Sequence, residues 1–449
     1  MLAASSIRAT LRQQQQANSM VQYLSNYGQH VGSLELVGHE HPVHGAITLH
    51  ELPHDTLQGL SSLSCSHMHL QLQPGDGFQG VLGPSASRKQ LQFTECTLLD
   101  GQEALAAALL LLTELQHLSL TRNASGMAWH GNGRGFYLHL SLNNQQMQQL
   151  THLELVKCGM QQPDGLQRLQ GLTRLQDLRL ECLGAHTVQA SMLSGLQQLT
   201  SLNVRGGYGG GTRTLEPGAL AGLTQLQHLA VVAFSTAGGS AGVAQLLYHL
   251  QHMQQLTHLD LSFTLRNGSP SVEAEASSAA AYSALTASSK LRHLNIGFCT
   301  LPAGAWQHMF PAGRQLPQLQ VLDIRVLTSV HSRAFSAPEG SRLVSCCPGL
   351  QSLTMAGLQR SDELLAPLQG LSGLRELNLG APACCSDALE GVRQLSRLRR
   401  LSMCDRSEEE ELLQQLLQQL PQLKQLTYLQ YNNTTAEIVY DLEFCEVGF

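Results

Sequence analysis

Positive charge is scarce in this chain of 449 residues. It contains only four lysines, charged residues of both signs make up 13% of the sequence, and the formal net charge is -6. A protein face that binds nucleic acid needs a cluster of Lys and Arg side chains. We therefore expect no nucleic-acid partner.

Long apolar runs are also missing. The longest purely apolar stretch covers residues 104–112, which is well short of the roughly 20 residues that a membrane-spanning helix needs. Residues 1–12 lack the apolar core of a secretory signal, and the 11 cysteines include no C-x-x-C pair. We expect no membrane association and a reducing, cytoplasmic location. The Ser and Arg residues near the start also fit a transit peptide, which leaves an organelle as the alternative.

What the chain has instead is a short apolar pattern that recurs along most of its length. The pattern is L-x-x-L-x-L, and the mean spacing between copies is about 28 residues. Clear copies begin at Leu115, Leu150, Leu175, Leu199, Leu226, Leu256, Leu291, Leu319, Leu350, Leu374 and Leu398. Weaker copies begin at Val31, Leu60, Arg88 and Leu426. Together they make about 15 repeats.

The spacing within each copy predicts a strand. In LTHLEL the second and third leucines, Leu153 and Leu155, are two residues apart, so they point to the same side of a strand. His152 and Glu154 then point to the other side. Each strand can pair with its counterpart in the next repeat to form a parallel sheet, and the rest of each repeat returns the chain through helices and turns.

These repeated motifs resemble those of leucine-rich-repeat proteins. The eighth residue after the first leucine is Asn123, Cys158 or Cys299 in three copies, as in the ribonuclease-inhibitor-like and cysteine-containing classes, the second of which is typical of F-box proteins. The resemblance implies an α/β fold. Its form is a curved, horseshoe-shaped leucine-rich-repeat solenoid, with the parallel sheet on the concave face and helices and turns on the convex face.

We expect three segments along the chain. Residues 1–30 form an N-terminal tail and capping helix, with the helix over residues 19–31 leading into the first strand. Residues 31–435 form the repeat domain. Residues 436–449 alternate apolar and polar side chains and form a C-terminal cap, either an edge strand or a hairpin.

The concave face is the expected binding surface, because the outward residues of every strand gather on it. Its candidate partner-binding residues are His152, Glu154, Asp177, Arg179, Glu181, Arg205, His228, Val232, His258, Asp260, His293, Asp323 and Arg325. A glycine-containing insertion at residues 126–137 adds Trp129, Arg134 and Tyr137. Aromatic and Arg side chains in loops are common at binding sites, although an expanded loop without a function is an equal alternative.

Histidines recur in two places. Residues 39–54 hold five of them, but their spacing matches no zinc motif, so we interpret this tract as a surface loop. Another five occupy the third position of the strand motif: His117, His152, His228, His258 and His293. Neighbouring rings could hold a metal ion or respond to pH. Duplication of a repeat that contained the motif L-x-H-L is a simpler explanation for the recurrence of these histidines. We therefore predict no metal, no cofactor and no catalytic residues.

The sequence thus favours a protein-interaction scaffold over an enzyme. The resemblance to the F-box-associated class implies a sharper form, the substrate-recognition part of a Skp–cullin–F-box ubiquitin ligase, which would bind a Skp-type adaptor if an F-box lies upstream. A structural component, for example of the ciliary axoneme, is the alternative.

The register of the motif can be tested with two neighbouring substitutions. We expect Leu153→Asp to unfold at least the adjacent repeats, because an unpaired charge in the core costs several kcal/mol. His152→Asp, on the water-facing side, should leave the melting temperature nearly unchanged. Thermal unfolding followed by circular dichroism measures both variants, and equal melting temperatures would show that the register is wrong.

Overall fold

The fold was analysed in a computed structural model. The structure describes residues 5–38, 59–70, 88–98, 105, 109, 112–121, 124–125, 147–157, 167–181, 187–206, 214–236, 239–265, 279–302, 304–325, 337–355, 366–379, 392, 394–403, 425–431 and 434–437. The chain divides into two compact units, Met1–Gln225 (unit 1) and Leu226–Phe449 (unit 2). Each unit is described by itself.

Unit 1 is built on a parallel sheet whose strands pair in chain order. Its strands are β1 (Ser5–Thr10), β2 (Val31–Val37), β3 (Ser62–Ser66), β5 (Gln90–Thr94), β7 (His117–Thr121), β9 (His152–Val156), β10 (Asp177–Glu181) and β12 (Ser201–Arg205). The register aligns the second apolar position of each motif: Leu118 pairs with Leu153, and Leu153 pairs with Leu178. The leucines therefore form columns beneath the sheet, as the motif predicts.

Unit 2 follows the same plan. Its strands are β14 (His228–Val232), β16 (His258–Asp260), β17 (His293–Asn295), β18 (Val321–Asp323), β19 (Ser352–Met355), β20 (Glu376–Leu379), β21 (Arg400–Met403), β22 (Tyr428–Tyr431) and β23 (Thr434–Glu437). Neighbours pair in parallel from β14 to β22. The last strand, β23, pairs with β22 in the antiparallel direction and begins just before the predicted C-terminal cap. Residues 438–449 of that cap lie outside the described residues.

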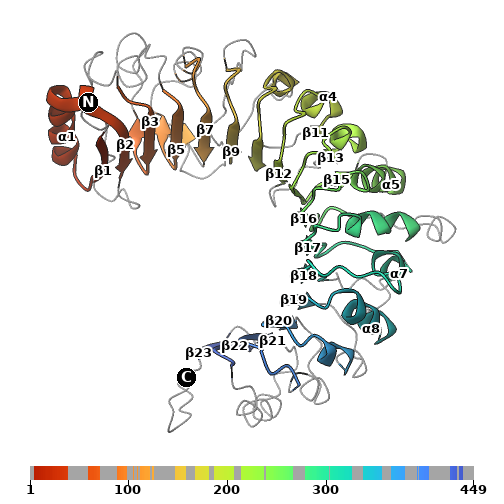
Figure 1. Ribbon diagram of the computed structural model, residues 1–449. Helices are drawn as coiled ribbons and strands as arrows, with labels where there is room; N and C mark the ends of the chain where they lie inside the picture. Colours follow the sequence, from red (N-terminus) through yellow and green to blue (C-terminus); the bar gives the residue numbers. More distant parts are fainter. Residues whose placement is uncertain are drawn as a thin grey trace, which may run out of the picture. The chain divides into compact units, whose positions relative to one another are not determined.

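Short helices and a second set of two-residue strands return the chain from one strand to the next. Unit 1 contains α1 (Gln14–Tyr27), η1 (Gly28–His30), η3 (Gln167–Gly171), α4 (Ala190–Leu193), η4 (Pro217–Leu220), and the short strands β4 (His69–Leu70), β6 (Thr97–Leu98), β8 (Ala124–Ser125), β11 (Thr187–Val188) and β13 (Thr214–Leu215). Unit 2 contains β15 (Ser235–Thr236), α5 (Gly239–Leu250), η5 (Ala280–Thr286), α7 (Ala305–Met309), α8 (Ala337–Cys346) and η7 (Ala366–Gly370). In unit 2 the helices lie on the opposite side from the strands (Figure 1).

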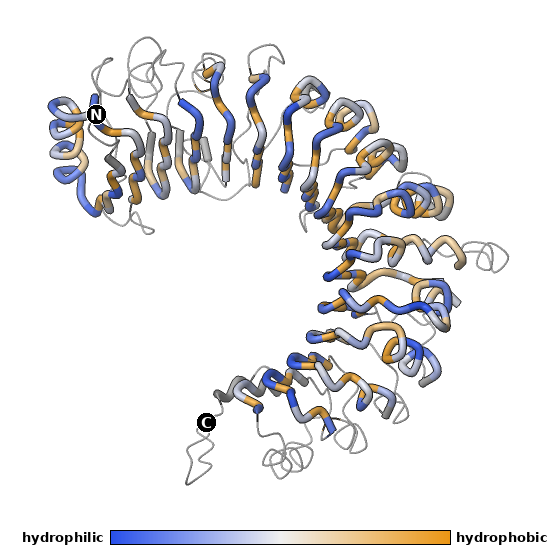
Figure 2. Tube along the Cα trace, viewed as in Figure 1, coloured by the Kyte–Doolittle hydropathy of each residue, from blue (hydrophilic) through white to orange (hydrophobic). Residues whose placement is uncertain are grey.

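Hydrophobic and hydrophilic residues alternate along the strands (Figure 2). Leu153 and Leu155 are 1% and 0% exposed, whereas His152 and Glu154 between them are partly exposed. The vicinal Cys346 and Cys347 are buried, and Cys384 and Cys385 lie outside the described part. None of the helices in the described part is long and apolar enough to span a membrane.

Six of the strands end in the same turn. Six residues other than glycine have φ between 52° and 60°, and each is the seventh residue after the first apolar position of its motif: His67, Glu95, Lys157, Ala233, Phe263 and Phe298. This left-handed conformation is unfavourable for a residue with a Cβ atom. Its recurrence in six repeats indicates that this turn redirects the chain after those strands.

The eighth residue of the motif then points back into the core. The Thr264 hydroxyl donates a hydrogen bond to the Val231 carbonyl of the preceding repeat at 2.5 Å, and the Cys299 thiol donates to the Leu261 carbonyl at 3.0 Å. Both side chains are buried. A short donor at this position satisfies a buried carbonyl, which is the physical reason that Asn, Cys and Thr recur there.

The structure departs from the expected N-terminal tail. Residues 5–10 form β1, which pairs in parallel with β2 and aligns Ile7 with Leu34. The capping helix is present as α1, but it begins at Gln14, earlier than the sequence indicates, and it buries Ala17 and Leu24 completely. The alternation in Ser-Ile-Arg-Ala-Thr, residues 6–10, was the signal for this edge strand.

In one repeat the first position of the motif, which is normally apolar, holds a charged residue. Arg88 begins its motif where a leucine normally stands, and it is only 1% exposed. Its Nε and Nη1 atoms have no hydrogen-bond partner among the described residues. Burial lowers the pKa of Arg88 to about 10, so the guanidinium is still charged at neutral pH.

We expect Arg88→Leu to stabilise the protein by about 1–3 kcal/mol, because it removes unsatisfied buried donors and restores the apolar column. Chemical denaturation measures the change, with Lys89→Leu as the matched control, because Lys89 is the next residue before β5 and is exposed. A less stable Arg88→Leu variant would mean that the guanidinium has a stabilising partner.

Candidate functional site

The water-facing side of the sheet, which we call the sheet face, collects the polar residues of the motif. In unit 1 the pairing of β7, β9 and β10 places His117, His152 and Asp177 in one row. The next row contains Ser119, Glu154 and Arg179. All of the candidate residues predicted on the strands of both units lie on this face, partly or fully exposed. Trp129, Arg134 and Tyr137 lie outside the described residues, so the loop site stays a prediction.

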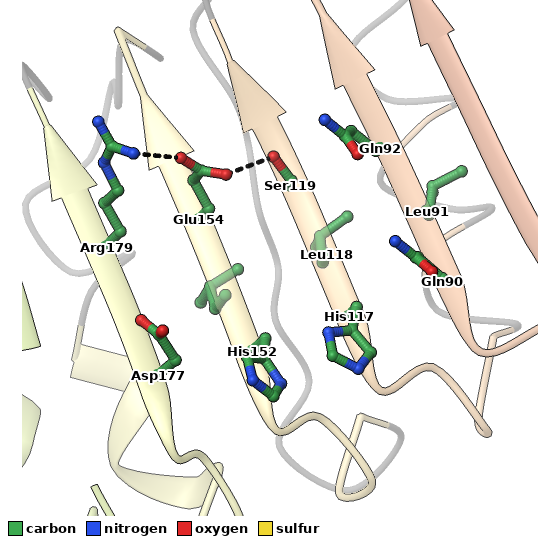
Figure 3. Close-up of a pocket in the computed structure, with 11 residues that line it drawn as sticks. Gln90, Leu91, Gln92, His117, Leu118, Ser119, His152, Glu154, Asp177 and Arg179 are labelled. Carbon is green, nitrogen blue, oxygen red and sulfur yellow. Dashed lines mark hydrogen bonds and ion pairs between the residues drawn. The ribbon is translucent and has the colours of Figure 1, made fainter. Parts of the chain in front are cut away.

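A charged network fixes the second row (Figure 3). Arg179 contacts Glu154 through Nη1 at 3.0 Å and Glu181 through Nη2 at 3.0 Å. The Ser119 hydroxyl donates to the other oxygen of Glu154 at 2.7 Å. The Arg179 and Glu154 side chains are 43% and 32% exposed, so the network can be reached from solvent. The sequence showed these residues to be on one face but did not show that they bind one another.

Two histidines stack in the first row. The rings of His117 and His152 have centroids 4.1 Å apart and planes 18° apart. Thr151 donates its hydroxyl hydrogen to the Gln116 carbonyl at 3.1 Å, so it accepts a hydrogen bond from Nδ1 of His152 at 2.8 Å. In the neutral ring this assigns the proton to Nδ1 and leaves Nε2 of His152 as an acceptor.

The face is hollowed between β5 and β10. The hollow has a volume of about 330 Å³. It is lined by Gln90, Leu91, Gln92, His117, Leu118, Ser119, His152, Leu153, Glu154, Asp177 and Arg179. The lining is mainly polar and draws on four neighbouring repeats. The side chains of its leucines are 0–1% exposed and belong to the core beneath the sheet. Gln90, Gln92 and Ser119 were not among the predicted site residues, because single polar residues of this kind are common on any strand.

Unit 2 carries a longer histidine stack on its own sheet face. The rings of His228 and His258 have centroids 4.3 Å apart, and those of His258 and His293 have centroids 4.1 Å apart with planes only 12° apart. Thr257 donates to the Gln227 carbonyl and accepts from Nδ1 of His258, as Thr151 does for His152. The pairing of β14, β16 and β17 therefore makes the predicted histidine row a physical contact.

The stack does not have the geometry of a metal site. A metal ion lies in the plane of each imidazole that binds it, at about 2.0–2.1 Å for zinc. Two rings stacked with nearly parallel planes cannot both contain the same ion. No group of three or more His, Cys, Asp or Glu side chains within the described ranges is arranged to hold a metal. The His-rich tract at residues 39–54 lies outside those ranges.

Stacking and burial keep the imidazoles neutral. Burial, with contributions from His293, His228 and Arg292, lowers the pKa of His258 from 6.5 to about 4. The pKa of His293 is lowered by burial and by His228 and Arg292. In unit 1, burial and the neighbouring His152 lower the pKa of His117. His117, His258 and His293 therefore add no positive charge to the sheet faces at neutral pH.

Beyond the C-terminal ends of β16 and β17, an aromatic pair lies beside a salt bridge. Asp323 accepts from Nε of Arg325 at 3.0 Å, and the guanidinium lies 4.9 Å from the ring centroid of Phe298. Phe298 stacks on Phe263 at 4.3 Å. The sequence predicted Asp323 and Arg325 but missed both phenylalanines, because they follow the strand at the left-handed position of the turn.

Comparison with known proteins supports the fold. No family model and no curated protein matches the chain. Among solved structures, an internalin from Listeria monocytogenes is similar, with a TM-score of 0.56 and 16% identity over 86% of this chain and 93% of the internalin. TLR13 in a complex with ssRNA13 has a TM-score of 0.48 and 16% identity over 88% of this chain and 54% of that chain, so the match spans about half of TLR13.

At such identities the likeness to the internalin shows the fold alone. Together with the parallel sheets, it confirms the predicted α/β leucine-rich-repeat solenoid. The assignment to the F-box-associated class stays a prediction.

The histidine stack predicts a specific acid sensitivity. Native His258, with its pKa near 4, holds a proton less tightly than the unfolded chain does near 6.5, so folding loses stability as the pH falls through this window. We expect the melting temperature to drop between pH 7 and pH 5, and the drop to be smaller in His258→Gln. An NMR titration of the His258 ring measures the pKa directly, and a midpoint near 6.5 would contradict the prediction.

Proposed function

We propose that the protein is a non-enzymatic scaffold that binds another protein through its sheet faces. The observation that carries this proposal is that the polar side chains on these faces are paired with one another and still accessible to solvent. They are fixed by one another, as in the Glu154–Arg179–Glu181 network, yet they keep substantial exposure. A rigid, accessible surface of paired charges and hydrogen-bonding groups suits protein recognition.

The charge distribution favours a protein over a nucleic acid. On the described sheet faces, Arg8 pairs with Glu35, Arg325 with Asp323 and Arg400 with Glu376. Arg205 donates to the side chain of Asn203 at 3.0 Å. Because these arginines are already engaged and the pKa values of His117, His258 and His293 are lowered, the faces offer little positive charge to a phosphate backbone.

The side-chain chemistry also favours binding over catalysis. Ser119, the serine nearest to the His117–His152 stack in the hollow, donates its hydrogen to Glu154, whose charge is held by Arg179. His152 donates to Thr151. The serine and the histidines are thus engaged with other groups, whereas an acyl-transfer site needs a serine bonded to a histidine.

The sharper form of the proposal is a substrate receptor of a Skp–cullin–F-box ubiquitin ligase. Its support is the cysteine or other short donor at the eighth residue of the motif, seen at Cys96, Thr264 and Cys299. Co-purification of a Skp-type adaptor with the full-length protein would support this form, and its absence from a complex that retains the other partner would oppose it.

A substitution series tests the sheet-face proposal once a partner has been obtained by cross-linking and mass spectrometry. The variants are Arg179→Ala and Arg205→Ala in unit 1, and His228→Ala and Asp260→Ala in unit 2. We expect some of the four to weaken binding by about 1 kcal/mol or more, measured by isothermal titration calorimetry.

Tyr248→Ala is the matched control. Tyr248 is 58% exposed on α5, on the helical side of unit 2, and its removal should not change the affinity. If the four sheet-face variants bind normally while Tyr248→Ala abolishes binding, the partner uses the helical side and the proposal is wrong.

A further inference from the structure

Asp177 stands out on the sheet face of unit 1. The other carboxylates of that face have cationic partners: Glu35 contacts Arg8, and both Glu154 and Glu181 contact Arg179. Asp177 lines the hollow and is partly exposed, but within the described residues its carboxylate has no hydrogen bond or ion pair. It is therefore a negative charge that the fold leaves uncompensated.

The surroundings of Asp177 are suited to a cation. His152 is its register partner on β9, and the Thr151 hydrogen bond leaves Nε2 of that ring as an acceptor. Burial and His152 lower the pKa of His117, so this neighbouring ring is also neutral and does not compete for the carboxylate. Arg179 is the only described cation in the lining, and it is shared between two glutamates. The hollow is net negative.

The geometry also argues against a free metal ion as the occupant. No group of three or more His, Cys, Asp or Glu side chains within the described residues is arranged to hold a metal ion. The head of a Lys or Arg side chain carries only hydrogen-bond donors, so it needs only a carboxylate and a further acceptor. The hollow supplies both in Asp177 and His152.

The size of the hollow limits the occupant. At about 330 Å³ it lies at the small end of ligand pockets, which range from about 300 to 1,000 Å³. It is large enough for one long side chain, and the imidazole rings of His117 and His152 in its lining can contact the methylene groups of such a chain.

We propose that this hollow binds a single Lys or Arg side chain from an extended segment of the partner protein, with Asp177 as the counter-ion. The methylene stem packs against the imidazole rings that line the hollow, and the cationic head reaches Asp177 and Nε2 of His152. This inference rests on the proposed function, since it names the chemistry that the sheet face of unit 1 recognises.

The test uses peptides selected by phage display from a random linear library against the full-length protein. We expect the enriched sequences to share a Lys or Arg. In isothermal titration calorimetry, Asp177→Asn should weaken the best peptide by about tenfold or more, because a hydrogen bond to a charged group contributes about 1.5–3 kcal/mol. Glu114→Gln is the matched control, because Glu114 is exposed in the turn before β7 and outside the hollow. It should not change the affinity.

A double-mutant cycle makes the assignment specific. Replacing the shared basic residue of the peptide by Gln should also weaken binding about tenfold, and it should have little further effect on the Asp177→Asn protein. Additive losses would overturn the proposal, as would enriched peptides without a basic residue, or no enrichment at all. Asp177→Ser, with its melting temperature measured alongside, replaces Asp177→Asn if the latter fails to fold.

The same peptides separate this inference from the general function. Peptides that bind normally to Asp177→Asn but lose affinity for Arg205→Ala would overturn the cation site and leave sheet-face binding in place. Peptides that are indifferent to every sheet-face substitution would overturn both. Displacement of the peptide by an acidic peptide or by single-stranded RNA, in place of a basic peptide, would also overturn the cation site.

Discussion

The alignment of equivalent leucines from one repeat to the next is the constraint on which the rest of the structure depends. Leu118, Leu153 and Leu178 pair directly across three strands and are almost completely buried. Since side chains alternate along a strand, fixing these leucines on one side fixes His152, Glu154 and their counterparts on the other. A slip of one residue would exchange core and surface. The polar face is therefore set by the same interaction that builds the core, and repeats of different length can vary only in the connections behind the sheet.

The left-handed turn that follows six of the strands adds a second constraint. Unlike the burial of the leucines, this turn costs conformational free energy. It places residues such as Ala233 and Phe263 in the left-handed conformation, which is unfavourable for them, but it directs the next side chain into the core. There Thr264 satisfies a carbonyl of the preceding repeat, while Phe234 at the equivalent position fills space instead. The strain of the turn is offset by burial and by the hydrogen bond. Only the shape of the residue and its donor hydrogen matter, which explains why the chemical identity at this position varies.

The sequence was sufficient to predict the fold class, the strands that begin at His117, His152 or Asp177, and the outward direction of their polar residues, because all of these follow from spacing within one repeat. It could not predict which side chains bind one another. Glu154 and Arg179 belong to different repeats, and their contact depends on the register between strands and on side-chain rotamers. It also missed β1, because a single strand outside the repeated pattern has no periodicity to identify it. Contacts between repeats need three-dimensional information, whereas the face of a residue does not.

The histidine rows show how duplication of a sequence motif changes the properties of the side chains that it repeats. Duplication of L-x-H-L places rings side by side at 4.1–4.3 Å, and crowding with partial burial then keeps His258 unprotonated. The arginines on the same faces are neutralised by acids or engaged by amides. Charges that are already paired need less reorganisation when a partner covers them, and they penalise a partner whose groups do not match. On a surface where most charges are paired, a carboxylate without a cationic partner should have a large effect on which partner protein is selected. For that reason Asp177, rather than the more numerous paired charges, is the group on which the choice of partner should depend most strongly.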